Sequence, residues 1–214
     1  MKSNIFFTSD LHIGSRNIIS YCNRPYRSVE EMDESLIHNW NSVVTKSDTI
    51  WMLGDMIWGH QNYRRILSRL NGQKFLVLGN HDTEQVYKKM QIDGLIQGMY
   101  KSKSVTIDGQ YIYLSHYPHR SWNRSFHGAW HLYGHCHNTI EDYGLSTDCG
   151  VDKWNYTPVS FEQLKDYFKD RDKYYNSSTK DDYEKYNRDY HEHFIAKYKE
   201  RISEEAKILE GLVC

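Results

Sequence analysis

The sequence of 214 residues predicts a mixed α/β domain followed by a helical extension. Two observations carry this prediction. Short apolar runs typical of buried strands alternate with segments of helical periodicity, and the composition changes near residue 170. We therefore expect one domain over residues 1–170, and a linker with a long amphipathic helix over residues 171–214.

The expected strands are apolar runs of four or five residues that are bounded by turn residues. They cover residues 5–9, 49–53, 75–78, 104–107, 111–115, 130–133 and 145–149. Asp108-Gly109 separates two of these runs and is a hairpin signal.

Helical patterns lie between and after these runs. One helix begins at the capping-box pattern Ser28–Glu31 and continues with apolar residues at helical spacing: Met32, Leu36, Ile37, Trp40 and Val44. A second contains Ile66, Leu67 and Leu70 and is expected to end at Asn71-Gly72, and a third begins at the capping box Ser160–Gln163. Beyond Asp181 an apolar stripe recurs every three or four residues: Tyr183, Tyr186, Tyr190, Phe194, Tyr198, Ile202, Ala206 and Leu209.

The composition narrows the class of protein. With 27 Lys and Arg against 28 Asp and Glu, the net charge of -1 does not by itself indicate a nucleic-acid binder. The four cysteines form no C-x-x-C pair, which suits a reducing compartment. Because the first apolar run is too short for a signal peptide or a membrane span, we expect a cytoplasmic protein with no membrane partner.

Polar side chains follow five of the expected strands, at the point where each strand ends. The blocks are Asp10-Leu11-His12, Gly54-Asp55, Gly79-Asn80-His81-Asp82, Ser115-His116 and Gly134-His135-Cys136-His137. Open α/β sheets place their sites at the carboxyl ends of strands. We therefore expect these side chains to converge.

Carboxylates, imidazoles and one amide form a ligand set that suits Mn, Fe or Zn. In the blocks at Asp10 and at His135 two candidate ligands are one residue apart. We expect each pair to share one face of extended backbone, with Cys136 pointing away from the site.

The five blocks, in this order, resemble the signature of the calcineurin-like metallophosphoesterase family, which is D-x-H, G-D, G-N-H-[DE], H and G-H-x-H. The resemblance covers roughly residues 1 to 165. It implies two mixed β-sheets packed together with helices outside, a four-layer arrangement. It also implies two divalent metal ions, with manganese expected and iron or zinc as alternatives.

The resemblance assigns roles to residues of this chain. Asp10, His12 and His137 would hold one metal, Asn80, His116 and His135 would hold the other, and Asp55 would bridge them. His81 would be the catalytic histidine near the leaving group, with Asp82 orienting its ring. An all-helical phosphohydrolase site at His81-Asp82 is the alternative, and the strand at 75–78 argues against it.

The substrate is expected to be a phosphate ester. The chain has no room for a large cap domain between the blocks, which favours an open site and a phosphodiester of nucleotides or nucleic-acid ends. Arg16, Arg24 and Arg120 are candidate phosphate-binding residues, because guanidinium matches phosphate oxygens bidentately. The aromatic stretch 122–130 and its neighbours His119, His127 and His131 could either wall a nucleotide site or serve packing.

Three alternatives to this function stay open. The same motifs fit a phosphomonoesterase or a phosphoprotein phosphatase. A non-catalytic metal-binding scaffold that binds partners through the C-terminal helix is a different class. The apolar stripe of that helix also favours a homo-oligomer.

Overall fold

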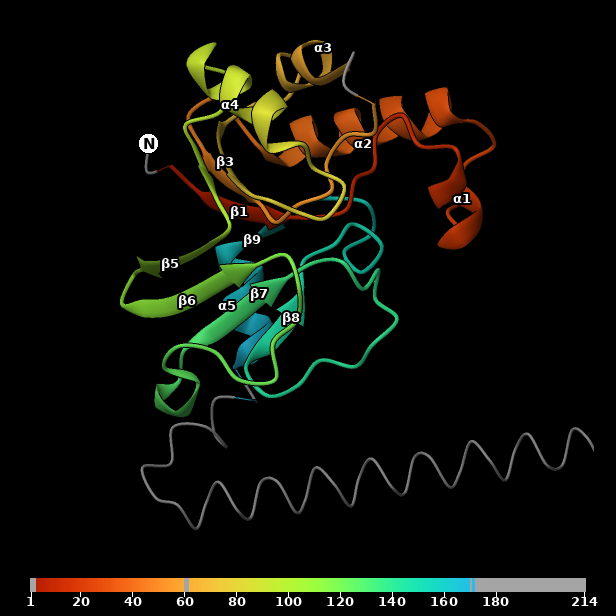
Figure 1. The fold of residues 1–214 in the computed structure, drawn as a ribbon. Helices are drawn as coiled ribbons and strands as arrows, with labels where there is room; N and C mark the ends of the chain where they lie inside the picture. Colours follow the sequence, from red (N-terminus) through yellow and green to blue (C-terminus); the bar gives the residue numbers. More distant parts are fainter. Residues whose placement is uncertain (1–2, 60–61, 170, 172–214) are drawn as a thin grey trace, which may run out of the picture.

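The computed structural model of the protein describes residues 3–59, 62–169 and 171. Figure 1 shows two β-sheets, one above the other, with helices on the upper face of the upper sheet. The apolar stripe expected after Asp181 lies outside the described residues. Within the part of the chain that is described, no helix is long and apolar enough to cross a membrane.

The upper sheet is mostly parallel. Its strand order is β4 (Gly98–Tyr100), β3 (Gln73–Val77), β2 (Thr49–Met52), β1 (Ile5–Thr8) and β9 (Val159–Ser160). Strands β1 to β4 pair in parallel, and β9 pairs antiparallel with β1. The last strand of the chain therefore lies beside the first.

The lower sheet is also mixed. Its strand order is β5 (Ser102–Ile107), β6 (Gln110–Ser115), β7 (Trp130–Tyr133) and β8 (Ser146–Asp148). Strands β5 and β6 form the expected antiparallel hairpin, whereas β6, β7 and β8 pair in parallel. Because β1, β6 and β7 all run toward the right-hand side of Figure 1, their carboxyl ends meet there.

Helices cover the upper sheet and join the lower core. They are α1 (Asn17–Tyr21), α2 (Val29–Val43), α3 (Tyr63–Leu67), α4 (Glu84–Ile92), α5 (Phe161–Phe168) and the 3₁₀ helix η2 (Ser125–His127). α2, α3 and α4 lie over the five-stranded sheet (Figure 1). α5 packs on Trp130 of β7, whose ring centroid lies 4.6 Å from that of Phe168.

The upper sheet separates two hydrophobic cores, because successive side chains of a strand point to opposite faces. Phe6, Ile50 and Leu76 pack with α2, α3 and α4. Phe7 and Trp51 pack with residues of the lower sheet and α5. Burial on both faces explains why these strands are continuous apolar runs in the sequence.

The fold class and the two packed mixed sheets are confirmed, and the structure corrects some boundaries. The helix expected to reach Asn71 ends at Leu67. Asn71 contacts α2 instead: its backbone N–H donates to the Asn41 side-chain oxygen, and its carbonyl accepts from the Trp40 indole. The short elements α1, α4 and β4 are not found by sequence periodicity.

The two capping boxes differ. At Ser160 the box is complete: the Ser160 hydroxyl accepts from the Gln163 N–H, and the Gln163 side-chain oxygen accepts from the Ser160 N–H. At Ser28 only half of it forms: the hydroxyl accepts from the Glu31 N–H, but the Glu31 carboxylate accepts from the N–H of Arg27.

Candidate metal centre

All seven candidate ligands lie together at the carboxyl ends of the strands. Asp10 and His12 follow β1, and Asp55 follows β2. Asn80 follows β3, His116 follows β6, and His135 and His137 follow β7; β4 and β5 come between β3 and β6 in the chain. The two sheets therefore share one site, to which each contributes ligands.

The ligands form two groups. In the first group the ligand atoms of Asp10, His12 and His137 all lie within 4.8 Å of one another. The second group is Asp55, His116 and His135, also within 4.8 Å. The Asn80 side-chain oxygen lies 2.9 Å from His116 Nε2 and 3.0 Å from His135 Nδ1, which adds Asn80 to the second group.

Asp55 lies between the groups. Its Oδ2 is 3.8 Å from His12 Nε2 in the first group and 3.4 Å from His116 Nε2 in the second. Its Oδ1 accepts a hydrogen bond from the backbone N–H of His81 at 2.9 Å. One oxygen is thus fixed by the backbone, and the other faces both groups.

Buried polar atoms without partners show that the site suits a cation. Asp10 Oδ1 and His12 Nε2 are buried and have no hydrogen-bond partner among the residues that the structure describes. Leaving such an atom unsatisfied costs about 1–3 kcal/mol. A divalent cation satisfies both atoms, and a carboxylate with neutral imidazoles is a donor set that Mn, Fe and Zn accept.

Burial also shifts the pKa values of the first group. It raises the pKa of Asp10 to about 7 and lowers that of His12 to about 3, because burial disfavours the charged form of each. His12 is therefore neutral at neutral pH, with a lone pair available for a cation. A bound cation would in turn favour the ionised Asp10.

The ligands are not held in extended backbone, which corrects the expected geometry. Five of the seven have positive φ angles: Asp10 (56°), His12 (50°), Asp55 (54°), His135 (70°) and His137 (47°). This left-handed conformation costs an L-residue about 1–2 kcal/mol. Such strain is typical of functional sites.

Two glycines allow the ligand loops to approach closely. A Cβ atom at Gly79 would lie 2.2 Å from Asp55 Oδ1, and one at Gly134 would lie 1.9 Å from Ser9 Oγ. The glycines of these motifs therefore have a steric role in addition to permitting a turn. Any side chain there would push a neighbouring ligand loop away.

Arg24 differs from its expected role. The guanidinium is buried and donates to both carboxylate oxygens of Asp152, to the carbonyls of Asp10 and Leu11, and to the sulfur of Met32. All five of its N–H donors are directed at protein atoms. Arg24 therefore supports the Asp10 loop and is not available to a phosphate.

Asp152 is a site residue that the sequence reasoning missed. Its Oδ2 lies 2.7 Å from His137 Nδ1 while Arg24 holds the carboxylate from the other side. A carboxylate on the far nitrogen of a ligating imidazole fixes the ring and strengthens it as a ligand. Asp152 follows the strand ending at Asp148, the same kind of signal that identified the other blocks.

Cys22 lies beside this pair. Cys22, His137 and Asp152 place three ligand atoms within 4.8 Å. The Arg24 guanidinium already occupies the Asp152 carboxylate at 2.8 Å, and a second cation there would be repelled by it. We therefore interpret the cluster as a group that positions the His137 ring.

Burial raises the pKa of Cys136, the cysteine between the two histidine ligands, to about 11.

His81 and Asp82 face different surroundings. The His81 side chain is 43% exposed, and its Nε2 lies 4.0 Å from Asp55 Oδ2, at the open side of the cluster. The Asp82 Oδ2 accepts from the backbone N–H groups of Asp55 and Gly79. Asp82 thus joins the loops after β2 and β3, in contrast to the expected role of orienting the His81 ring.

The remaining candidates lie outside the ligand cluster. Arg16 is exposed at the start of α1, and the exposed Arg120 packs over the Tyr143 ring at 4.4 Å. Trp122 is buried and its indole donates to the Ala129 carbonyl, so it serves packing. His131 is also buried: burial lowers its pKa to about 4, and its Nε2 accepts from the His119 N–H.

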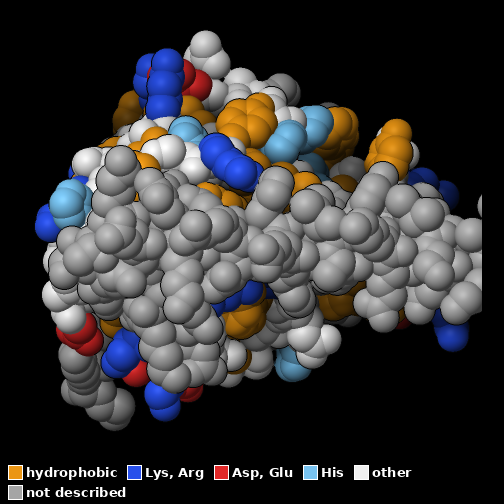
Figure 2. Space-filling view, turned by 90° about the horizontal axis from the view of Figure 1, so that it is seen from below, with side chains coloured by type: hydrophobic (Ala, Val, Ile, Leu, Met, Phe, Trp, Pro, Cys, Tyr) orange, Lys and Arg blue, Asp and Glu red, His pale blue; other side chains and the backbone are white. Residues whose placement is uncertain are grey.

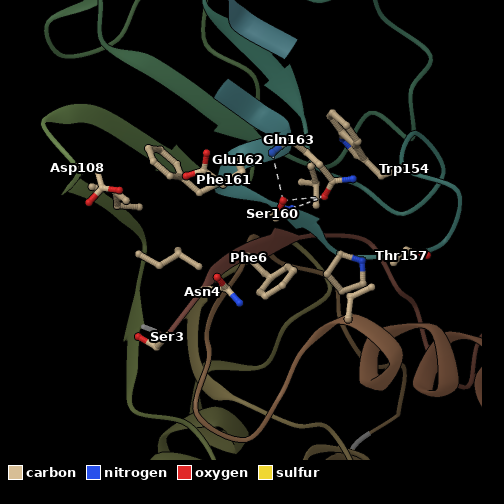
Figure 3. Close-up of a pocket in the computed structure, with 15 residues that line it drawn as sticks. Ser3, Asn4, Phe6, Asp108, Trp154, Thr157, Ser160, Phe161, Glu162 and Gln163 are labelled. Carbon is tan, nitrogen blue, oxygen red and sulfur yellow. Dashed lines mark hydrogen bonds between the residues drawn. The ribbon is translucent and has the colours of Figure 1, made fainter. Parts of the chain in front are cut away.

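A cavity of about 420 Å³ lies at the opposite end of β1 (Figure 3). Its described lining includes Asn4, Phe6, Trp154, Phe161 and Glu162, none of which is a candidate ligand. Among the described residues that line it, Asp108 and Glu162 are acidic and no Lys, Arg or His occurs. Such a lining disfavours a phosphate, so we do not assign substrate binding to this cavity.

The chain is similar in sequence to two proteins and in fold to a third. The chain is 34% identical over 170 residues to the uncharacterized protein MJ1445 of Methanocaldococcus jannaschii, covering 75% of this chain and 88% of that protein. It is 29% identical over 184 residues to the gene 66 protein of Mycobacterium phage D29, covering 72% and 90%. The protein of unknown function AQ665 from Aquifex aeolicus shares the fold, with a TM-score of 0.62, 23% identity and coverage of 78% of this chain and 100% of that chain.

The family itself follows from a direct match. Residues 3–189 match the model of the calcineurin-like phosphoesterases. The match extends past residue 165, the limit that the motifs alone indicated. With two mixed sheets, flanking helices and potential metal ligands at the strand ends, the chain belongs to the calcineurin-like phosphoesterase family.

Proposed function

We propose that the protein is a dinuclear metal-dependent phosphodiesterase acting on nucleotides or nucleic-acid ends. The observation that carries this proposal is Asp55, whose Oδ2 lies within 3.8 Å of a ligand nitrogen in each group. A carboxylate in this position can bridge two cations about 3.5–4 Å apart, the spacing of two-metal phosphoesterases.

The protein's residues would divide the chemistry as follows. Asp10, His12 and His137 would hold one divalent ion, Asn80, His116 and His135 the other, and Asp55 both. Two such ions supply Lewis acidity toward the phosphoryl oxygens and lower the pKa of water. Manganese is the metal that we expect, with iron or zinc as alternatives.

His81 would hold the proton for the leaving oxygen. Its side chain is 43% exposed, and its Nε2 lies 4.0 Å from the bridging carboxylate, so a departing group can reach it. The His81 N–H also donates to Asp55 Oδ1, which fixes the start of the loop. A positioned general acid of this kind accelerates a reaction about 10²–10⁴-fold.

The open surroundings of the site favour a diester over a buried monoester. Asn80 and His81 are both exposed, so a chain that continues on both sides of the phosphate fits without obstruction. On the described part of the face in Figure 2, Lys and Arg side chains stand apart among hydrophobic and His side chains. The net charge of -1 likewise favours a small or single-stranded substrate over a long duplex.

The test is hydrolysis of bis-p-nitrophenyl phosphate, p-nitrophenyl phosphate and 2′,3′-cyclic nucleotides with added Mn, Fe or Zn, together with metal analysis of the purified protein. We expect two metal ions per chain and a preference for the diesters. Preference for p-nitrophenyl phosphate would identify a monoesterase. A metal-free, inactive protein under all conditions would identify the non-catalytic scaffold.

A further inference from the structure

Two partly exposed aromatic side chains touch the candidate metal centre. The Trp58 side chain is 46% exposed, and its ring centroid lies 5.0 Å from that of His81. Tyr117 is 49% exposed, with its ring centroid 4.6 Å from that of His135 and 5.1 Å from that of His116. One aromatic ring thus lies beside the candidate acid and the other beside the second ligand group.

Both rings stand on fixed backbone. The Trp58 N–H donates to the Ile13 carbonyl at 2.7 Å, directly after the loop that carries Asp10 and His12. The Tyr117 carbonyl accepts from the Ser115 hydroxyl at 2.7 Å, next to the candidate ligand His116. Their positions relative to the metal centre are therefore set by the same loops that set the ligands.

Their environment points to binding. Large aromatic side chains contribute most to stability when they are buried, as Trp40 and Tyr87 are in this protein. Trp58 and Tyr117 instead present about half of their surface to solvent beside the candidate ligands and His81. An exposed aromatic ring with a fixed position is a stacking platform, because every nucleobase has a π face.

We propose that Trp58 and Tyr117 stack the two bases that flank a scissile phosphodiester, with Trp58 on the leaving-group side. This inference rests on the proposed function, since the side is assigned through the contact of Trp58 with His81. The substrate would then be a dinucleotide or the end of a single strand, bound with little preference for particular bases. Arg120 is not required, because its guanidinium packs on Tyr143.

The test compares a thymidine dinucleotide with analogues in which one or both bases are replaced by hydrogen. The metal-loaded full-length protein is assayed next to Trp58→Ala and Tyr117→Ala. For each variant we expect kcat/KM on the dinucleotide to fall about 5- to 150-fold, the factor that corresponds to losing one stacked base. The loss should shrink on the analogue that lacks the base served by that ring.

Conservative and remote variants separate stacking from structural damage. Trp58→Phe and Tyr117→Phe keep a π face and should retain the preference for bases. Tyr21→Ala removes an aromatic side chain that is 85% exposed on α1 and should leave hydrolysis of every substrate unchanged. Metal content, measured for each variant, should match that of the parent.

The outcomes are distinct. A parent that hydrolyses bis-p-nitrophenyl phosphate but cuts the dinucleotide and the doubly abasic analogue equally well overturns the stacking proposal and leaves the phosphodiesterase standing. Equal losses on all substrates in the alanine variants also overturn it. A parent that hydrolyses no diester overturns the proposed function instead.

Discussion

The two halves of the candidate metal centre are built differently. In the first half, Asp10 and His12 are buried and His137 is backed by the Asp152–Arg24 pair. In the second half His116 is buried, as is the shared Asp55, whereas Asn80 is exposed and His135 is half-buried. The difference teaches that one half is part of the protein core while the other lies at the protein surface. We expect the first half to bind its metal more tightly.

The largest effect is expected from Asp55→Asn, which removes the negative charge shared by the halves. Two cations would then repel one another without compensation, and turnover on bis-p-nitrophenyl phosphate should fall to background. Metal analysis should show loss of one ion, from the exposed half. A near-normal kcat of the variant in metal-replete buffer would show that Asp55 does not bridge two metal ions.

His81→Ala tests the candidate general acid, which lies at the exposed side of the metal centre. Turnover should fall about 10²–10⁴-fold on esters with poor leaving groups, the usual contribution of a general acid. On p-nitrophenyl esters the loss should be much smaller, because that leaving group hardly needs a proton. Equal losses on both kinds of ester would contradict the acid role, and loss of metal would make His81 a ligand.

Asp152→Asn tests the support of the buried half. An amide cannot strengthen the His137 imidazole as a carboxylate does, so metal affinity should fall about 10–100-fold. Titration calorimetry should assign the loss to the tighter of two binding events. The exposed Glu162→Gln, remote from both groups, is the matched control. A loss confined to the weaker event would show that the halves are assigned in the wrong order.

The affinity of the buried half should rise with pH. Burial works to lower the pKa of His137, but the hydrogen bond with Asp152 outweighs it and raises the pKa to about 10. Below that pH the metal-free ring carries a proton on the nitrogen that must bind the metal. Between about pH 7 and 10 affinity should therefore increase about tenfold per unit as one proton is released per ion. Calorimetry in buffers of different ionisation enthalpy measures the number of protons released per metal ion. A metal affinity that is independent of pH would contradict the prediction.

The smallest effect on chemistry is expected from deleting residues 172–214. All candidate ligands precede this segment, so metal-dependent hydrolysis of a small diester should persist. The apolar stripe of the segment predicts self-association, so the truncated protein should sediment as a smaller assembly. If the full-length protein is already a monomer, the predicted self-association is wrong. If the truncated protein stays folded but loses activity, the segment contributes to the active site.

The sequence predicts the sheets and the ligand cluster well because both leave local signals. Apolar runs mark strands buried on two faces, and polar residues with glycine mark their carboxyl ends. Trp58 and Tyr117 escaped because their place is defined by contacts between distant segments, Trp58 with His81 and Tyr117 with His135. Asp152 follows a strand as the other blocks do, but only its contacts with the distant Arg24 and with His137 mark it as part of the site. The contacts of Asp82 with two loops and the burial of Arg24 were missed for the same reason, whereas the positive φ angles of five ligands were missed because Asp and His do not signal left-handed backbone as glycine does.

The pairing of β9 with β1 has a consequence for synthesis of the protein. Ser9 bridges Gly150, and Arg24 bonds to Asp152, so the loop that carries Asp10 and His12 is completed by the far end of the domain. A ribosome must release about 150 residues before the buried half can close. Because contacts so distant in sequence form slowly, we expect the candidate carboxylates and imidazoles of this half to stay unassembled until the segment around Asp152 has left the ribosome, and a metal would bind there only after that point.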